Sequence, residues 1–183
     1  MAQCGLAGTE MGSNVAKDER IDALRVAIRE RFPAIPIPAG DDVALHECNE
    51  CIAIRAAFAG RIWDSLQPNE LEARFDSLPM LSPSAFKYYL AAYLIYSLKH
   101  LEPDCLVCQF TIYAIAPDED TKEAKFIDWW RERLLLFMPE QFEVLVQFVD
   151  LARRQEAFHG FIPSLEHANE RLQRYYANTV TDH

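Results

Sequence analysis

Apolar residues recur three and four positions apart along most of the chain, which is the spacing of one helix face. The first clear series predicts a helix over 21–32 that ends before Pro33, because proline disfavours the helical conformation of the residue that precedes it. The following stretch, 33–40, contains three prolines and ends on a glycine. We therefore expect an extended connector there.

Prolines and capping residues delimit the other predicted helices. Ser82 and Pro83 form an N-cap with proline at the first helical position, and they open a helix that reaches about His100. The stretch 105–115 suits a buried strand as well as a helix, but a lone strand would have no partner, so we expect a helix. The remaining helices are expected over about 41–60, 68–78, 118–137, 139–152 and 163–175. The pattern predicts an all-α fold, a single compact helical bundle of six to eight helices with little or no strand.

Length and composition set the domain organisation. The chain has 183 residues, of which 50% are hydrophobic, so it can bury a core without a disulfide or a metal and it is not intrinsically disordered. Residues 1–17 are small and polar and have no apolar periodicity, so we expect a flexible N-terminal tail followed by one helical domain over 18–183. The sequence alone leaves open whether Met1 or Met11 is the true start.

The charge balance bears on the partners. The chain carries 28 Asp and Glu against 18 Lys and Arg, for a net charge of −10. It has no basic cluster longer than Arg153–Arg154, so we expect neither nucleic acid nor a membrane surface as a partner. The longest apolar run, 88–98, is shorter than the roughly 20 residues of a membrane span, and no secretory signal precedes it. We expect a cytoplasmic location and a protein partner that is itself basic.

The run His46-Glu47-Cys48-Asn49-Glu50-Cys51 is the main candidate for chemistry. An imidazole and two thiols within six residues are zinc-ligand types, so His46, Cys48 and Cys51 form a candidate zinc site that is either structural or hydrolytic. The alternative is a helix N-terminus with exposed acids and one half-buried thiol. A redox role is disfavoured, because Glu47 and Glu50 oppose thiolate formation and no βαβ pattern precedes the motif.

A second pair, Cys105 and Cys108, repeats the two-residue gap. With the first pair it formally completes a four-cysteine zinc pattern, but more than fifty residues separate the two pairs. Cys105 and Cys108 also lie in an apolar run, where a free cysteine behaves as a small hydrophobic residue. We expect them to be core residues, and we expect the cysteines to be reduced thiols.

Other motifs favour binding over catalysis. The chain has no GxSxG elbow, no Gly-rich phosphate loop and no HExxH run, so we do not expect an enzyme. More than one face of the helix predicted after Pro83 carries tyrosines, namely Tyr88, Tyr89 and Tyr93. These tyrosines either line a pocket or an interface, or they pack in a crowded core.

Three runs carry a resemblance to a known family. They are His46 to Cys51, Phe58 to Trp63, and Leu81 to Leu94. The chain resembles an uncharacterised bacterial family of unknown function, whose members show HxCxEC, FxGxxW and LSPxAFxYYLPAYL runs. The resemblance extends over about residues 20–155, and Ala91 stands where the family has proline. Because that family has no established activity, the resemblance implies a bacterial, cytoplasmic protein and no mechanism.

Three functions remain open on the sequence. The leading hypothesis is a non-enzymatic, acidic protein-interaction domain of the immunity or antitoxin kind. The alternative is a zinc-binding metalloprotein that uses His46, Cys48 and Cys51, with no other cofactor expected. A third hypothesis is a small-molecule sensor with a concave apolar cavity beside Tyr89 and Tyr93.

Overall fold

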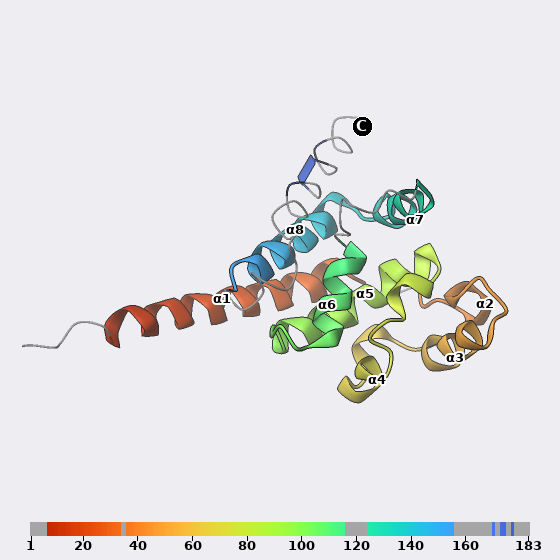
Figure 1. Ribbon diagram of the computed structural model, residues 1–183, viewed down its shortest axis with the longest axis horizontal. Coiled ribbons are helices and arrows are strands. Elements are labelled where there is room, and N and C mark those ends of the chain that lie inside the picture. Colours follow the sequence, from red (N-terminus) through yellow and green to blue (C-terminus); the bar gives the residue numbers. More distant parts are fainter. Residues whose placement is uncertain are drawn as a thin grey trace, which may run out of the picture.

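The computed structural model describes residues 7–33, 36–115 and 124–155, with four single positions at 170, 173, 174 and 177. Its α-helices are α1 (Ala7–Arg31), α2 (Gly40–Val43), α3 (Asn49–Phe58), α4 (Pro68–Glu72), α5 (Pro83–Lys99), α6 (Leu106–Ile115), α7 (Ala124–Leu134) and α8 (Pro139–Arg153). Two 3-10 helices are η1 (Trp63–Ser65) and η2 (Leu78–Met80). The described ranges contain no strand, so the predicted all-α class is confirmed (Figure 1).

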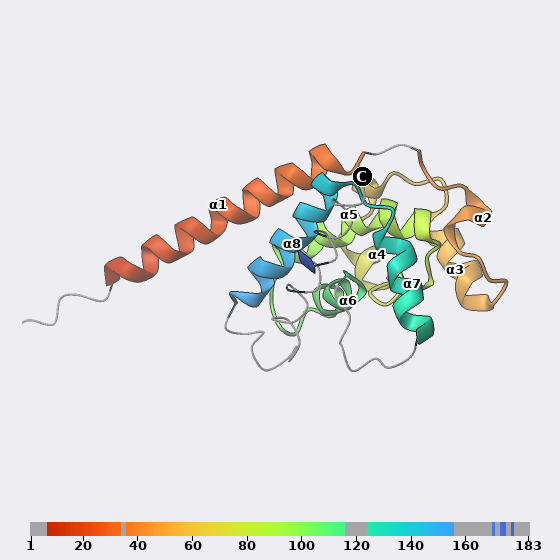
Figure 2. The same ribbon diagram turned by 90° about the horizontal axis from the view of Figure 1, so that it is seen from above.

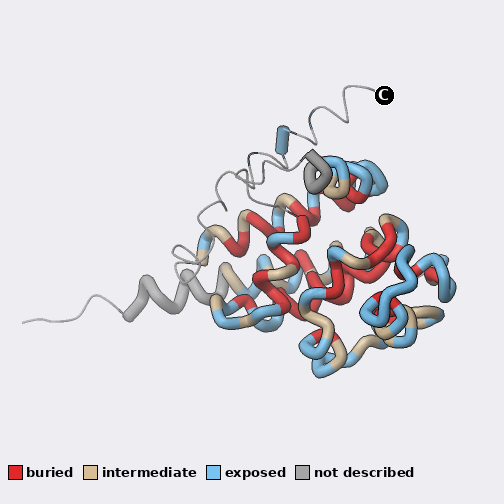
Figure 3. The backbone as a smooth tube through the Cα atoms, turned by 45° about the vertical axis from the view of Figure 1, so that its right-hand side comes forward, coloured by how far each residue is buried: buried red, intermediate tan, exposed pale blue. Residues whose placement is uncertain are grey.

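Helix α5 is the central element of the bundle. It contacts α1, α2, α4, α6 and α7, and 13 of its 17 residues are buried, so it is covered on all sides. The backbone tube shows buried residues gathered in the middle of the molecule and exposed ones toward the outside (Figure 3). Neighbouring residues define the start of α5. The Ser82 hydroxyl accepts a hydrogen bond from the Ala85 N–H at 3.2 Å, and Pro83 occupies the first helical position. The predicted bounds of this helix are confirmed.

Helix α1 is longer than the apolar pattern indicates. It begins at Ala7, so much of the segment that we assigned to an N-terminal tail, 1–17, is helical in the structure. Leu24 and Ile28 lie in the second half of α1, and Phe32 directly follows the helix. All three are buried, and α1 packs against α5 and α8. Figure 2 shows the first half of α1 extending away from the other helices. The prediction used apolar periodicity, which a helix that extends beyond the core does not need.

The helix predicted over 41–60 is two helices, α2 and α3. Ala44, directly after α2, is extended with φ −145° and ψ 134°, which ends the first helix. The guanidinium of Arg55 in α3 donates to the carbonyl of Ala44 at 2.8 Å and to the carbonyl of His46 at 2.9 Å. These long side-chain bonds satisfy the carbonyls of the break, and the apolar spacing of the segment does not reveal them.

The remaining bounds agree in part with the pattern. Residues 106–115 form helix α6, which confirms the choice of helix over strand, and α8 begins at the predicted Pro139. Helix α4 ends at Glu72, well before the predicted end, and a separate 3-10 helix follows. The expected helix start at 118–121 lies outside the described residues, and within the helix expected over 163–175 only positions 170, 173 and 174 are described.

An ion pair between Arg61 and Glu70 links the start of α4 to the turn after α3. The Arg61 guanidinium donates to Glu70 Oε1 at 2.6 Å and to Oε2 at 2.9 Å, and the Gln67 N–H donates to Oε2 at 2.7 Å. The hydrogen bonds from Arg61, and then that from the Gln67 N–H, lower the pKa of the Glu70 carboxyl to about 2. The carboxylate therefore stays charged in the folded state at pH values where an unfolded chain would protonate it.

We expect Glu70→Gln to destabilise the protein at neutral pH and to destabilise it less at acidic pH. Because the folded pKa lies below the unfolded value of about 4.3, the stabilisation is present above that value and is lost as the pH falls toward about 2. Urea midpoints of both proteins at pH values of about 7 and about 3.5 test this. Glu30→Gln, which removes an exposed carboxylate of α1, is the charge control. An unchanged Glu70→Gln effect at the two pH values would contradict the prediction.

Candidate functional site

The His46–Cys51 motif leads into α3. Cys48 is exposed and occupies the N-cap position, where its Sγ accepts a hydrogen bond from the Cys51 N–H at 3.4 Å. The Cys51 side chain is buried in the core, and His46 is exposed. The motif is therefore a helix start with one buried thiol, close to the non-metal alternative that its residue types left open.

The geometry gives the zinc hypothesis no support. Among the residues that the structure describes, no three His, Cys, Asp or Glu side chains are grouped in a way that could hold a metal ion. Cys105 and Cys108 lie at the start of another helix, α6, where the Cys105 Sγ accepts from the Cys108 N–H at 3.4 Å. Cys108 is fully buried, as expected of a core residue. The four cysteines are not brought together as one ligand set.

The three candidate tyrosines separate into two roles. Tyr89 and Tyr93 are fully buried, and their hydroxyls donate to backbone carbonyls, that of Tyr89 to Phe58 and that of Tyr93 to Arg74 at 2.7 Å. Burial raises the pKa of Tyr89 to about 12, so its phenol stays a proton donor. These two tyrosines are core residues, whereas Tyr88 lines the pocket described next.

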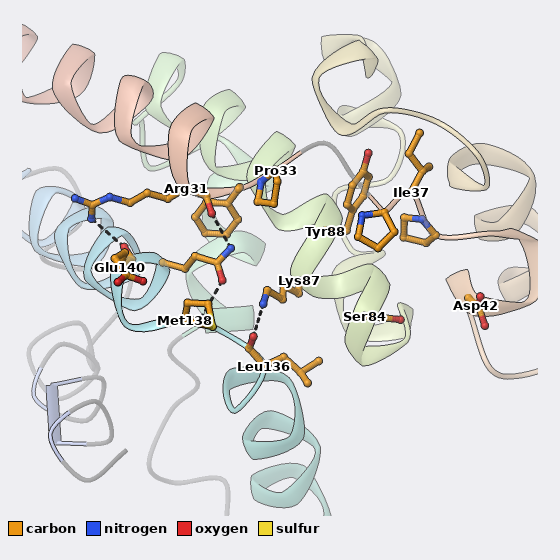
Figure 4. Close-up of a pocket in the computed structure, with 14 residues that line it drawn as sticks. Arg31, Pro33, Ile37, Asp42, Ser84, Lys87, Tyr88, Leu136, Met138 and Glu140 are labelled. Atoms are coloured by element: carbon orange, nitrogen blue, oxygen red, sulfur yellow. Dashed lines mark hydrogen bonds between the residues drawn. The ribbon is translucent and has the colours of Figure 1, made fainter. Parts of the chain in front are cut away.

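A pocket with a volume of about 700 Å³ opens beside Tyr88 (Figure 4). It lies between the end of α1, the connector before α2, the first turns of α5 and the junction of α7 and α8. Its lining is Arg31, Phe32, Pro33, Pro36, Ile37, Pro38, Asp42, Ser84, Lys87, Tyr88, Leu136, Met138, Glu140 and Gln141. The volume falls within the range of about 300–1,000 Å³ that is typical of ligand pockets, and most of the lining is apolar.

Hydrogen bonds between α1 and α8 hold one wall of the pocket in place. The Gln141 side chain donates to the Arg31 carbonyl at 2.8 Å, and it accepts from the Met138 N–H at 3.0 Å. The Arg31 guanidinium donates to the Glu140 carbonyl at 2.9 Å and to Glu143 Oε2 at 3.0 Å. Figure 4 shows the contacts of Arg31, Met138 and Glu140 at this wall. Arg31 is thus already paired, and its charge is compensated within the protein.

Lys87 brings a positive charge into the pocket. Its half-buried side chain donates to the Leu136 carbonyl, and its ammonium lies 5.9 Å from the centre of the Phe137 ring. Burial lowers the pKa of this ammonium. Among the described residues, the ion pairs that the structure shows do not include Lys87. The lining also includes the acidic residues Asp42 and Glu140, so the pocket combines apolar walls with charges of both signs. Lys87 is the cation that a negatively charged group could approach.

The apolar lining continues onto the outer surface. Leu135, Leu136 and Met138 lie in the junction between α7 and α8, and all three are exposed, Leu135 by 61% and Met138 by 59%. Leu136 and Met138 also line the pocket. An apolar patch that adjoins a pocket is typical of a surface that another molecule covers.

Sequence reasoning found only Tyr88 among the residues of this pocket. The lining comes from three segments that lie far apart in the chain and meet only when α1, α5 and α8 pack together. The one signal was the stretch 33–40, whose prolines we assigned to an extended connector. Proline side chains on such a connector present a rigid apolar surface, and three of them line the pocket.

These features define an all-α domain with a buried central helix and an apolar side pocket. A model of a family of unknown function (DUF6714) matches residues 41–180, and the chain belongs to that family. The motif-based resemblance to an uncharacterised family is thereby confirmed. No curated protein and no solved structure matches the chain. The connector residues Pro33 to Pro38 and the end of α1 lie before the matched range, so the pocket includes residues on both sides of its boundary.

The helices differ from membrane spans in length or in hydropathy. None of those in the described ranges is both long enough and apolar enough to cross a bilayer. The apolar residues of the central α5 are covered by the other helices of the bundle.

Proposed function

We propose that the protein is a non-enzymatic interaction domain that binds an apolar segment of a protein partner in the pocket beside Tyr88. The observation that carries this proposal is the continuity between the pocket and the exposed Leu135, Leu136 and Met138. A small molecule enclosed by the pocket would leave Leu135 and much of Met138 in water. A protein segment would cover the pocket and this surface together, which favours a macromolecular partner.

The Lys87 ammonium and the net charge of the chain indicate which chemical groups the partner carries. The Lys87 ammonium favours an apolar segment that carries a carboxylate, either as an acidic side chain or as a chain terminus. The whole chain has a net charge of −10, which would speed its encounter with a partner that is basic overall. An immunity-like or antitoxin-like role is one form of such an interaction.

Site-specific photocrosslinking in the native cells tests the location of the interface. A photoreactive amino acid replaces Met138 in one variant and Tyr113 in the other, since Tyr113 is exposed on α6 and lies outside the pocket. We expect one protein to be crosslinked from position 138 and not from position 113. Identical products from both positions, or none from position 138, would contradict the proposal.

Binding of the crosslinked protein, once purified, tests the role of the cation. We expect Lys87→Met to raise the Kd by about ten-fold, because it keeps the apolar stem and removes the ammonium that faces the carboxylate. Lys99→Met removes the same charge from the exposed end of α5 and should change the Kd by less than about two-fold. Titration calorimetry of the purified pair measures both values. Equal effects of the two substitutions would locate the interface elsewhere.

A further inference from the structure

Two helices of the protein begin in the same way, with a cysteine at the N-cap and a second cysteine three residues later. Cys48 and Cys51 start α3, and Cys105 and Cys108 start α6. In both pairs the first Sγ accepts the backbone N–H of the second cysteine at 3.4 Å. The two pairs differ in their surroundings, because Cys48 is exposed whereas Cys105 is half-buried.

The exposed pair combines two unequal thiols. The hydrogen bond from the Cys51 N–H is the largest of the effects that lower the pKa of the Cys48 thiol. Burial, together with the neighbouring Cys48 side chain, raises the pKa of the Cys51 thiol. In the second pair, burial raises the pKa of both Cys105 and Cys108. The first pair therefore combines an exposed thiol whose pKa is lowered with a buried thiol whose pKa is raised, whereas in the second pair both pKa values are raised.

The acidic residues Glu47 and Glu50 do not outweigh the effects that lower the pKa of the Cys48 thiol. Glu47 is paired with the Arg55 guanidinium at 3.0 Å, so its charge is compensated. Glu50 lies in the first turn of α3, where its charge raises the pKa of Cys48, but its effect is smaller than that of the Cys51 N–H. The objection that Glu47 and Glu50 raise against a redox pair is thus weakened by contacts that appear only in the folded chain.

We propose that Cys48 and Cys51 form a reversible dithiol–disulfide pair that exchanges with the disulfide of a low-molecular-weight thiol. The exposed Cys48 is the attacking group, and the adjacent buried Cys51 is the resolving group. This inference does not depend on the pocket, because neither cysteine lines it.

The exchange proceeds in two balanced steps. The Cys48 thiolate attacks one sulfur of the external disulfide, so that a bond forms between Cys48 Sγ and that sulfur while the second external sulfur leaves as a thiolate. The Cys51 thiol then gives its proton to the departed thiolate and attacks Cys48 Sγ. This second attack forms the Cys48–Cys51 bond and releases the remaining external thiolate, which takes a proton from water. The two protein thiols are oxidised, and one external disulfide is reduced to two thiols.

Alkylation of the native chain tests the reactivity of Cys48. A short pulse of iodoacetamide at neutral pH, followed by peptide mass spectrometry, measures the rate at each cysteine. We expect Cys48 to react at least about ten-fold faster than Cys105, because the two share the N-cap position and differ in exposure and thiolate fraction. Equal rates would overturn the proposal. Protection of Cys48 and Cys51 that a chelator relieves would also overturn it and would assign both thiols to a metal.

Glutathione disulfide tests the resolving step. The native chain should lose the mass of two hydrogens and yield a peptide that links Cys48 to Cys51. Cys51→Ala should stop at one glutathione on Cys48, Cys48→Ser should take up none at this motif, and Cys105→Ala should behave as the native chain. A glutathione that persists on Cys48 of the native chain would overturn the proposal. Because this arm uses the unaltered protein, it remains decisive even where Cys51→Ala does not fold.

Discussion

Tyr89→Ala is expected to lower the free energy of unfolding by about 3–5 kcal/mol. The Tyr89 side chain in α5 is fully buried, and the centre of its ring lies 4.9 Å from the centre of the Phe58 ring in α3. Removing the ring leaves a cavity between these helices and also removes the hydroxyl that donates to the carbonyls of Phe58 and Arg61. Because those carbonyls flank the turn at Gly60, which has φ 71°, the loss weakens the connection from α3 to η1.

Tyr89→Phe separates the two contributions. It keeps the ring and removes only the hydroxyl, so we expect a smaller loss of about 1–2 kcal/mol, with the carbonyl of Arg61 left without its tyrosine donor. Urea denaturation followed by circular dichroism measures both losses. Tyr113→Phe, at a site that is 40% exposed, is the control and should stay within about 0.5 kcal/mol of the native chain. A native-like midpoint for Tyr89→Ala would contradict the packing described for α5.

Arg133→Ala should have the second-largest effect, a loss of about 2–4 kcal/mol in the free energy of unfolding. Arg133 is only 5% exposed, and its guanidinium donates to the carbonyl of Leu81 at 2.6 Å and to that of Trp129 at 3.1 Å. It also lies 3.9 Å from the centre of the Trp129 ring. Burial lowers its pKa to about 10, so the group is still charged at neutral pH. The substitution leaves the Leu81 carbonyl, just before α5, without this donor.

Comparison with Arg133→Met identifies the source of that loss. Methionine refills part of the space without bringing a buried charge, so it should destabilise the protein less than alanine does. Arg131→Ala removes an exposed arginine from the same helix and should change the stability by less than about 0.5 kcal/mol. Thermal and urea unfolding of the three variants provide the test. Equal losses for Arg133→Ala and Arg131→Ala would show that the buried contacts contribute nothing.

The sequence by itself determined the elements whose ends depend on neighbouring residues. The Ser82 cap with Pro83 defines the start of α5, and Pro139 defines the start of α8, because a cap or a proline acts on the backbone within one turn. The all-α class followed from the apolar spacing in the same way. The family followed from three short runs, since a motif is a property of the chain and needs no fold to be recognised.

Only the tertiary structure decided features that join distant segments. The break between α2 and α3 is held by Arg55, and the role of each tyrosine depends on which neighbours enclose α5. The pocket exists because the end of α1, the connector with Pro36, and the junction before α8 meet beside Tyr88. The apolar run around Cys105 and Cys108 predicted core residues there, but the shared N-cap hydrogen bonds and the exposure of Cys48 are seen only in the folded chain. Periodicity reports which residues share a face, whereas burial and side-chain contacts across the chain arise only when those faces pack.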